Sequence, residues 1–184
     1  DEELLHLEER KSDRYLHAEQ LTVLIEDVII KSDISLKDLS AIALSKGPGS
    51  YTGLRIGTST AKGLCYALGI PLIAISTLRA MACEMAKIEN FSLYCPMIDA
   101  RRMEVFAAIF DKYNNQVRNI HADIVDVDTY SKYLIDKVLF FGDGAIKCEE
   151  IINDKNAFFK LDILPSAKNL AILAFKQYNN KEFE

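Results

Sequence analysis

Residues 45–57 read Ser-Lys-Gly-Pro-Gly-Ser-Tyr-Thr-Gly-Leu-Arg-Ile-Gly, a glycine-rich run between an apolar stretch and a helical pattern. Residues 39–44 have the length of a buried strand, and apolar residues recur at helical spacing after the run. This order predicts a strand, a tight turn and a helix. The early glycines permit backbone angles that other residues avoid, the proline fixes one angle, and a hydroxyl side chain can cap the helix. The residues expected to build this structural loop are Gly47, Pro48, Gly49, Ser50, Thr52 and Gly53.

The same loop also has features of a phosphate site, because a strand-to-helix turn directs backbone N–H groups at one point. The P-loop pattern requires Gly-Lys followed by Ser or Thr, which does not occur here. The dinucleotide pattern Gly-x-Gly-x-x-Gly is missed by one residue, and the next strand leads to Arg79, which could hold a ribose phosphate, rather than to an acid. A phosphate cradle, a weak dinucleotide site and a purely structural turn all stand as hypotheses. For the structural turn, a β-branched residue at Gly49 or Gly53 is expected to destabilise the fold through positive φ or close backbone approach.

Strands and helices alternate along the chain, which favours a parallel α/β unit followed by antiparallel strands. The first part predicts a helix from Ser12 or Asp13 to about residue 30, strands at 39–44 and 71–75, and helices at 53–68 and 76–87. The second part predicts strands at 91–98, 103–110, 117–125 and 138–141, and helices at 127–135 and 145–153. Residues 3–8 alternate loosely, like the last strand of a sheet.

Composition shifts near residue 90, so we expect two α/β halves, residues 1–89 and 90–184. The second half repeats the order of the first if a hairpin precedes residue 3. The chain does not begin with Met, so we expect residues to be missing before its start.

Overall composition favours a cytoplasmic globular protein. The net charge is −5 with no basic run, whereas a protein that holds a nucleic acid by itself would show a basic face. The 4 cysteines form no Cys-x-x-Cys pair, so neither a zinc site nor a disulfide framework is expected. No apolar run reaches the ~18 residues that a membrane span needs, and no signal peptide is evident.

Two charged or glycine-rich turns stand out in the second half. Asp99, Arg101, Arg102 and Glu104 form its densest charge cluster, in which Arg101 is either a phosphate or carboxylate clamp or part of a charged hairpin turn. Asp143 lies between two glycines, where it is either a metal ligand or a turn residue.

The glycine-rich run and the segment Gly69–Leu78 resemble the TsaB (YeaZ) family, whose members partner TsaD in making threonylcarbamoyladenosine in tRNA. The similarity continues at 98–106, 142–145 and 164–171. The resemblance implies an α/β fold with two ribonuclease-H-like halves, of the actin and Hsp70-type ATPase superfamily, in a chain that is truncated at both ends.

Compared with TsaD-type enzymes, the sequence lacks the residues that bind the catalytic metal. TsaD-type enzymes carry a His-x-x-x-His metal pair, which falls here at Thr77 and Met81, and His6, His17 and His121 are far apart in sequence. We therefore expect no catalytic, cofactor-binding or metal residues and no cofactor. The resemblance implies a non-catalytic partner of a TsaD-like enzyme, and the alternative is a nucleotide-binding transferase or glycoprotease-like enzyme of the same superfamily.

The expected partner surface combines two helices. The helix ending near residue 30 is apolar over more of its circumference than one sheet contact needs, with Val23 and Ile30 off the main stripe, and helix 53–68 carries small residues. Burial of both helices on their own sheet is the alternative. The resemblance implies a complex with a TsaD-like enzyme and a TsaE-like ATPase, a homodimer without the enzyme, and tRNA contact only through the complex. The residues expected to bind partners are His17, Leu21, Leu24, Gly57, Ala61 and Leu64.

Overall fold

The computed structural model describes residues 3–10 and 17–184, with the side chains of helix α1 described from residue 20 onward. The chain forms two compact units. The first comprises Asp1–Ser76 with Ser166–Glu184, and the second comprises Thr77–Pro165.

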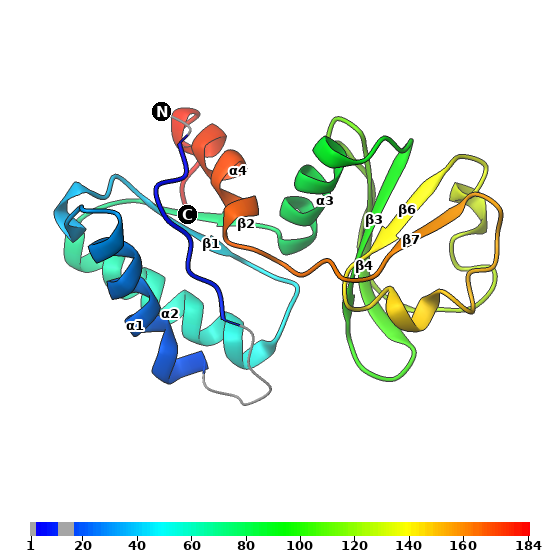
Figure 1. The fold of residues 1–184 in the computed structure, drawn as a ribbon, viewed down its shortest axis with the longest axis horizontal. Coiled ribbons are helices and arrows are strands. Elements are labelled where there is room, and N and C mark those ends of the chain that lie inside the picture. The colour runs from blue at the N-terminus through cyan, green and yellow to red at the C-terminus, as the bar shows by residue number, and fades with distance from the viewer. Residues whose placement is uncertain (1–2, 11–16) are drawn as a thin grey trace. The chain divides into compact units, whose positions relative to one another are not determined.

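The first unit is built on a parallel pair of strands, β1 (Ile42–Ser45) and β2 (Leu72–Ile75). Helix α2 (Tyr51–Leu68) connects them, α1 (His17–Lys31) lies beside α2, and α4 (Lys168–Asn179) contacts both strands (Figure 1). The predicted strand, turn, helix and strand are therefore confirmed, with β1 beginning at Ile42 because a 3₁₀ turn, η1 (Leu36–Asp38), precedes it.

Hydrogen bonds from nearby residues cap both ends of α2. The Ser50 side chain accepts a hydrogen bond from the Gly53 backbone N–H at 3.4 Å, which confirms a hydroxyl cap. The helix ends at Leu68 and is capped by Gly69, which adopts φ 67° and donates its N–H to the carbonyl of Cys65.

The second unit contains a five-stranded sheet in the order β5-β4-β3-β6-β7. Its strands are β3 (Leu93–Asp99), β4 (Glu104–Asp111), β5 (Gln116–Ile124), β6 (Val138–Phe141) and β7 (Ala157–Lys160). The first three are antiparallel, as predicted, whereas β6 and β7 run parallel to β3. Helix α3 (Thr77–Ile88) contacts β3 and β4.

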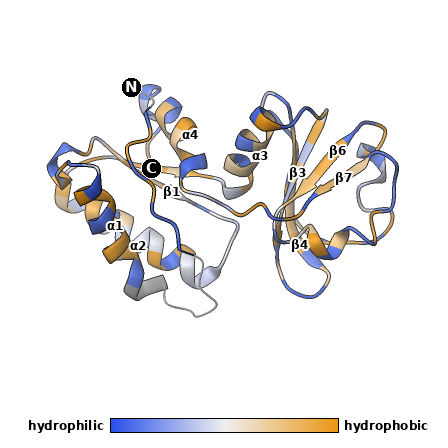
Figure 2. Cartoon of the chain, viewed as in Figure 1, coloured by the Kyte–Doolittle hydropathy of each residue, from blue (hydrophilic) through white to orange (hydrophobic). Residues whose placement is uncertain are grey.

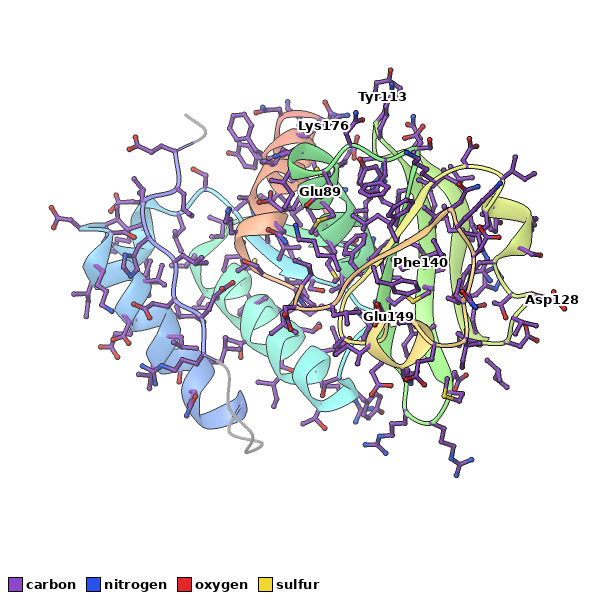
Figure 3. All side chains as sticks on the ribbon, turned by 45° about the vertical axis from the view of Figure 1, so that its right-hand side comes forward. Glu89, Tyr113, Asp128, Phe140, Glu149 and Lys176 are labelled. Carbon is purple, nitrogen blue, oxygen red and sulfur yellow. The ribbon has the colours of Figure 1, made fainter. Side chains whose placement is uncertain are left out.

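The central strands β3, β4 and β6 are buried on both faces, whereas most side chains of the edge strand β5 are exposed. Successive side chains of a strand point to opposite faces, so each central strand contributes to two clusters. One face packs against α3 through Tyr94, Leu139 and Phe141. The other carries Met97 and Phe140 with the residues after β5 and β6. The central strands are accordingly hydrophobic in Figure 2, and Phe140 lies inside the unit in Figure 3.

Three predicted elements are wrong. The helices expected at 127–135 and 145–153 are only short 3₁₀ turns, η2 (Ser131–Tyr133) and η3 (Ile146–Cys148). In the first, the Asp126 carboxylate accepts bonds from the Asp128 N–H and the Thr129 hydroxyl, which compete with helical bonding. The strand expected at 3–8 is absent from described residues 3–10, which form no ladder with another strand.

The compact units differ from the expected halves 1–89 and 90–184 at both boundaries. Helix α3 groups with the second unit because it packs on β3 and β4, and α4 groups with the first because it packs on β1 and β2. Within the part of the chain that the structure describes, no helix is both long and apolar enough to cross a membrane.

Candidate functional site

The turn between β1 and α2 depends on one glycine. Gly47 is buried with φ 95°, and a Cβ there would lie 3.1 Å from the Leu54 Cδ1 atom. Gly49 and Gly53 do not have positive φ, and a Cβ added to them would meet its nearest neighbours only at 4.0 Å and 3.5 Å, respectively. The expectation that Gly49 or Gly53 needs special backbone freedom is therefore wrong, and Gly47 takes that role.

We expect Gly47→Ala to lower the free energy of unfolding by about 1–3 kcal/mol, because alanine is strained at this φ and crowds Leu54. The matched control is Gly49→Ala, two residues away, where the added methyl has ordinary contacts. Urea unfolding followed by circular dichroism measures both variants. Equal stabilities for the two would contradict this assignment of the turn.

Helices α1 and α2 enclose two surface grooves. The larger groove, about 440 Å³, is lined mainly by apolar side chains: Thr22, Ile25, Glu26, Ile29, Ile30, Leu36, Thr60 and Leu64. The smaller groove, about 220 Å³, is lined by Arg10, Gln20, Leu21, Leu24, Gly53, Ile56 and Gly57. We call the larger one the upper groove and the smaller one the lower groove.

The structure brings together some of the predicted partner residues. Leu21, Leu24 and Gly57 line the lower groove, and Leu64 lines the upper groove. Ala61, in contrast, is buried with 6% of its surface exposed. His17 begins α1, but its side chain lies outside the described residues.

The upper groove includes Leu36, which the sequence pattern did not mark. Leu36 comes from η1, inside what the sequence presents as a polar connector, and no periodic pattern marks it. Ile30 is 67% exposed and Val23 is 45% exposed. Their position off the main apolar stripe of the helix is the signal that points to this surface.

Residues 3–10 are tied to α1 by charged side chains. Lys31 and His6 both contact the Glu8 carboxylate, and Arg10 pairs with Asp27 at 3.5 Å. The hydrogen bond from Lys31, followed by that from His6, lowers the pKa of Glu8 to about 2. Because these contacts join the segment to α1, they hold Arg10 beside the lower groove.

Thr77 and Met81 are the positions at which the resemblance places the histidine pair of TsaD-type enzymes, and both lie in the interior of the second unit. Thr77 is 6% exposed and Met81 is 1% exposed, and Met81 packs with Met85 and Phe141. Among the described residues, no group of three or more His, Cys, Asp or Glu side chains is arranged to hold a metal ion. Asp143 is exposed, and its Oδ1 atom accepts the Asp99 backbone N–H at 3.0 Å.

Comparison with known proteins places the chain in a family. A family model described as TsaD, tRNA N6-adenosine threonylcarbamoyltransferase, matches residues 12–178, so the chain belongs to this family. Its curated relatives place it in the TsaB (YeaZ) group, as the sequence motifs predict.

The relatives share part of their length with this chain. The tRNA threonylcarbamoyladenosine biosynthesis protein TsaB of Bacillus subtilis (strain 168) is 32% identical over 142 residues, which cover 75% of this chain and 61% of that protein. TsaB of Escherichia coli (strain K12) is 35% identical over 101 residues, covering 55% of this chain and 44% of that protein. The chain thus spans between 44% and 61% of the length of these two relatives.

A solved structure has the same fold. An uncharacterized protein with similarity to peptidase YeaZ, from Pseudomonas aeruginosa, superposes with a TM-score of 0.78 at 24% identity, over 92% of this chain and 80% of that chain. The similarity confirms the expected α/β fold, and the family match fits the actin and Hsp70-type superfamily.

Proposed function

We propose that this chain is a non-catalytic partner of a TsaD-like enzyme, which transfers threonylcarbamoyl to the tRNA adenosine next to the anticodon. The observation that carries the proposal is the burial of Thr77 and Met81, where a TsaD-type enzyme would present its metal-binding histidines. A hydroxyl and a thioether packed in a core do not supply the two imidazoles of such a site. The names of the relatives, as biosynthesis proteins of this tRNA modification, support the same pathway.

The exposed side of α1 supports the partner role. Ile30, Val23 and Leu36 are exposed hydrophobic residues on or beside the upper groove, and the apolar face continues to Leu64. Contiguous apolar surface of this kind marks protein interfaces more often than it marks free surface. We assign this face to the TsaD-like enzyme, with a homodimer as its occupant when the enzyme is absent and a TsaE-like ATPase joining the assembly in the cytoplasm.

Nucleotide binding separates this proposal from the alternative. A partner protein without its own chemistry is expected to bind ATP weakly or not at all when isolated. A calorimetric affinity in the low micromolar range that is lost in Ser50→Ala or Thr52→Ala would instead support a nucleotide-using transferase.

A charge on the upper groove should disrupt the complex. We expect Ile30→Glu to weaken binding to a TsaD-like enzyme by at least about tenfold, because a carboxylate would lose its water in an apolar interface. Ile30 suits this test because it is 67% exposed, so the fold tolerates the change. Ala61→Glu does not, because Ala61 is buried and the variant would disrupt the packing of α2.

Ile135→Glu is the matched control, since Ile135 is 83% exposed and belongs to the second unit. Titration calorimetry with the enzyme and sedimentation of the isolated chain measure both assemblies. If Ile30→Glu binds the enzyme as tightly as Ile135→Glu does, the partner surface lies elsewhere.

A further inference from the structure

The turn between β3 and β4 presents two consecutive arginines in an unusual backbone conformation. Arg101 has φ 72° and Arg102 has φ 46°, both in the left-handed region. Residues with a Cβ avoid this region, and two in a row are rarer still. A turn of this kind persists only where the surrounding structure holds it in place.

The side chain of Lys147, from η3, holds this turn in place through three contacts. Its ammonium group donates to the Arg102 carbonyl at 2.6 Å and to the Glu104 carbonyl at 2.8 Å, and it also pairs with the Asp99 carboxylate. The Asp99 carboxylate in turn accepts the Arg101 backbone N–H at 2.9 Å. The polar backbone groups of the turn are therefore used inside the unit.

The same contacts leave the two guanidinium groups available. Asp99 and Glu104 are the carboxylates nearest in sequence. Lys147 pairs with Asp99, and that hydrogen bond is the main cause of the lowered pKa of Asp99; in the described part of the chain, no ion pair joins Glu104 to either arginine. Arg101 and Arg102 are both exposed, and no other side chain among the described residues forms an ion pair or hydrogen bond with either guanidinium group. The chain as a whole carries a net charge of −5, so two adjacent exposed arginines form a positively charged spot on an acidic protein.

We propose that Arg101 and Arg102 form a contact point for the phosphate backbone of RNA, which we call the arginine tip. A planar guanidinium group binds phosphate through two parallel N–H bonds, a geometry that lysine does not offer. Two guanidinium groups on adjacent residues of a turn with a held backbone can reach neighbouring phosphates of one strand. The choice of RNA rests on the proposed function, in which the enzyme complex holds a tRNA. The arginine tip adds to that binding and does not replace the enzyme's own contacts, in keeping with the acidic character of the chain.

The first test uses the complex of the full chain with a TsaD-like enzyme. Arg101→Gln/Arg102→Gln should weaken tRNA binding by roughly tenfold at 0.1 M salt and reduce the slope of log K against log salt by about 1.5, as expected for two lost phosphate contacts. Arg101→Lys/Arg102→Lys should keep most of the slope, because it retains both charges, but lose affinity. Lys112→Gln/Lys155→Gln is the charge-matched control and should change neither quantity.

The second test uses the isolated chain, so it does not depend on the enzyme. Titration of an anticodon stem-loop RNA at low salt should shift the Nε–Hε nuclear magnetic resonance signals of Arg101 and Arg102 more than those of other arginines. If the shifts are absent, or if the glutamine variant binds tRNA with an unchanged salt slope, the arginine tip is not an RNA contact. A wild-type chain that shows these shifts but never binds the enzyme would overturn the proposed function and leave the RNA contact standing.

Discussion

Gly142→Ala is expected to destabilise the second unit by about 3 kcal/mol or more, the largest loss we expect from a single added methyl group. Gly142 follows β6 with φ 105°, and a Cβ there would lie 2.2 Å from the Met97 carbonyl oxygen. That oxygen belongs to β3, which is hydrogen-bonded on both sides within the sheet, so it has little freedom to move away. Urea denaturation followed by circular dichroism measures the loss.

Gly63→Ala is the matched control for this change. Gly63 lies inside α2 with nothing within 4 Å of its added Cβ, so alanine should stabilise the helix by about 0.5–1 kcal/mol. The two substitutions are chemically identical and should act in opposite directions. A Gly142→Ala variant as stable as the wild type would show that β3 and the turn after β6 are not in close contact.

Asp123→Ala should lower the free energy of unfolding by about 2–4 kcal/mol, because it leaves a largely buried cation without its partner. Arg118 donates to the Asp123 carboxylate at 2.7 Å, and the buried Tyr130 hydroxyl donates to the same carboxylate at 2.8 Å. The exposed Asp128→Ala is the control and should change stability by less than about 0.5 kcal/mol. Thermal unfolding at neutral pH compares them.

The loss should depend on pH in a defined direction. Burial alone would raise the pKa of Asp123, but the hydrogen bonds from Arg118 and Tyr130 outweigh it and leave the pKa below its usual value of 3.8. The folded protein therefore binds this proton less readily than the unfolded chain does, and the stabilisation is present above about pH 4 and lost as the pH falls through the folded pKa. The wild type and Asp123→Ala should converge in stability below that range. A gap that stays constant down to about pH 2 would contradict the role of the ionised carboxylate.

Local pattern predicted most of the regular elements. The run before Gly47 and the helical spacing after Gly53 correctly indicated β1 and α2, and the apolar stretch 138–141 matches β6. Hydrophobic periodicity succeeds there because each element buries a continuous face against one neighbour.

The failures have a different origin. The sequence near Gly47 contains three glycines, and their spacing does not distinguish the one with positive φ; in the structure it is Gly47, where an added Cβ would also crowd Leu54. Likewise, the helix expected near Asp126 is replaced by side-chain bonds to the backbone. The lower groove follows from the helical spacing of Leu21 and Leu24, whereas the upper groove also needs Leu36, which lies outside any periodic pattern.

Reconstitution of the tRNA modification tests the central claim most directly. A purified TsaD-like enzyme, supplied with the threonylcarbamoyl donor and unmodified tRNA, is assayed with and without this chain, and threonylcarbamoyladenosine is quantified by mass spectrometry. We expect little product from the enzyme alone, none from the chain alone, and full modification with both, reduced when the chain carries Ile30→Glu. Equal product without the chain, or product formed by the chain alone, would contradict a role as non-catalytic partner.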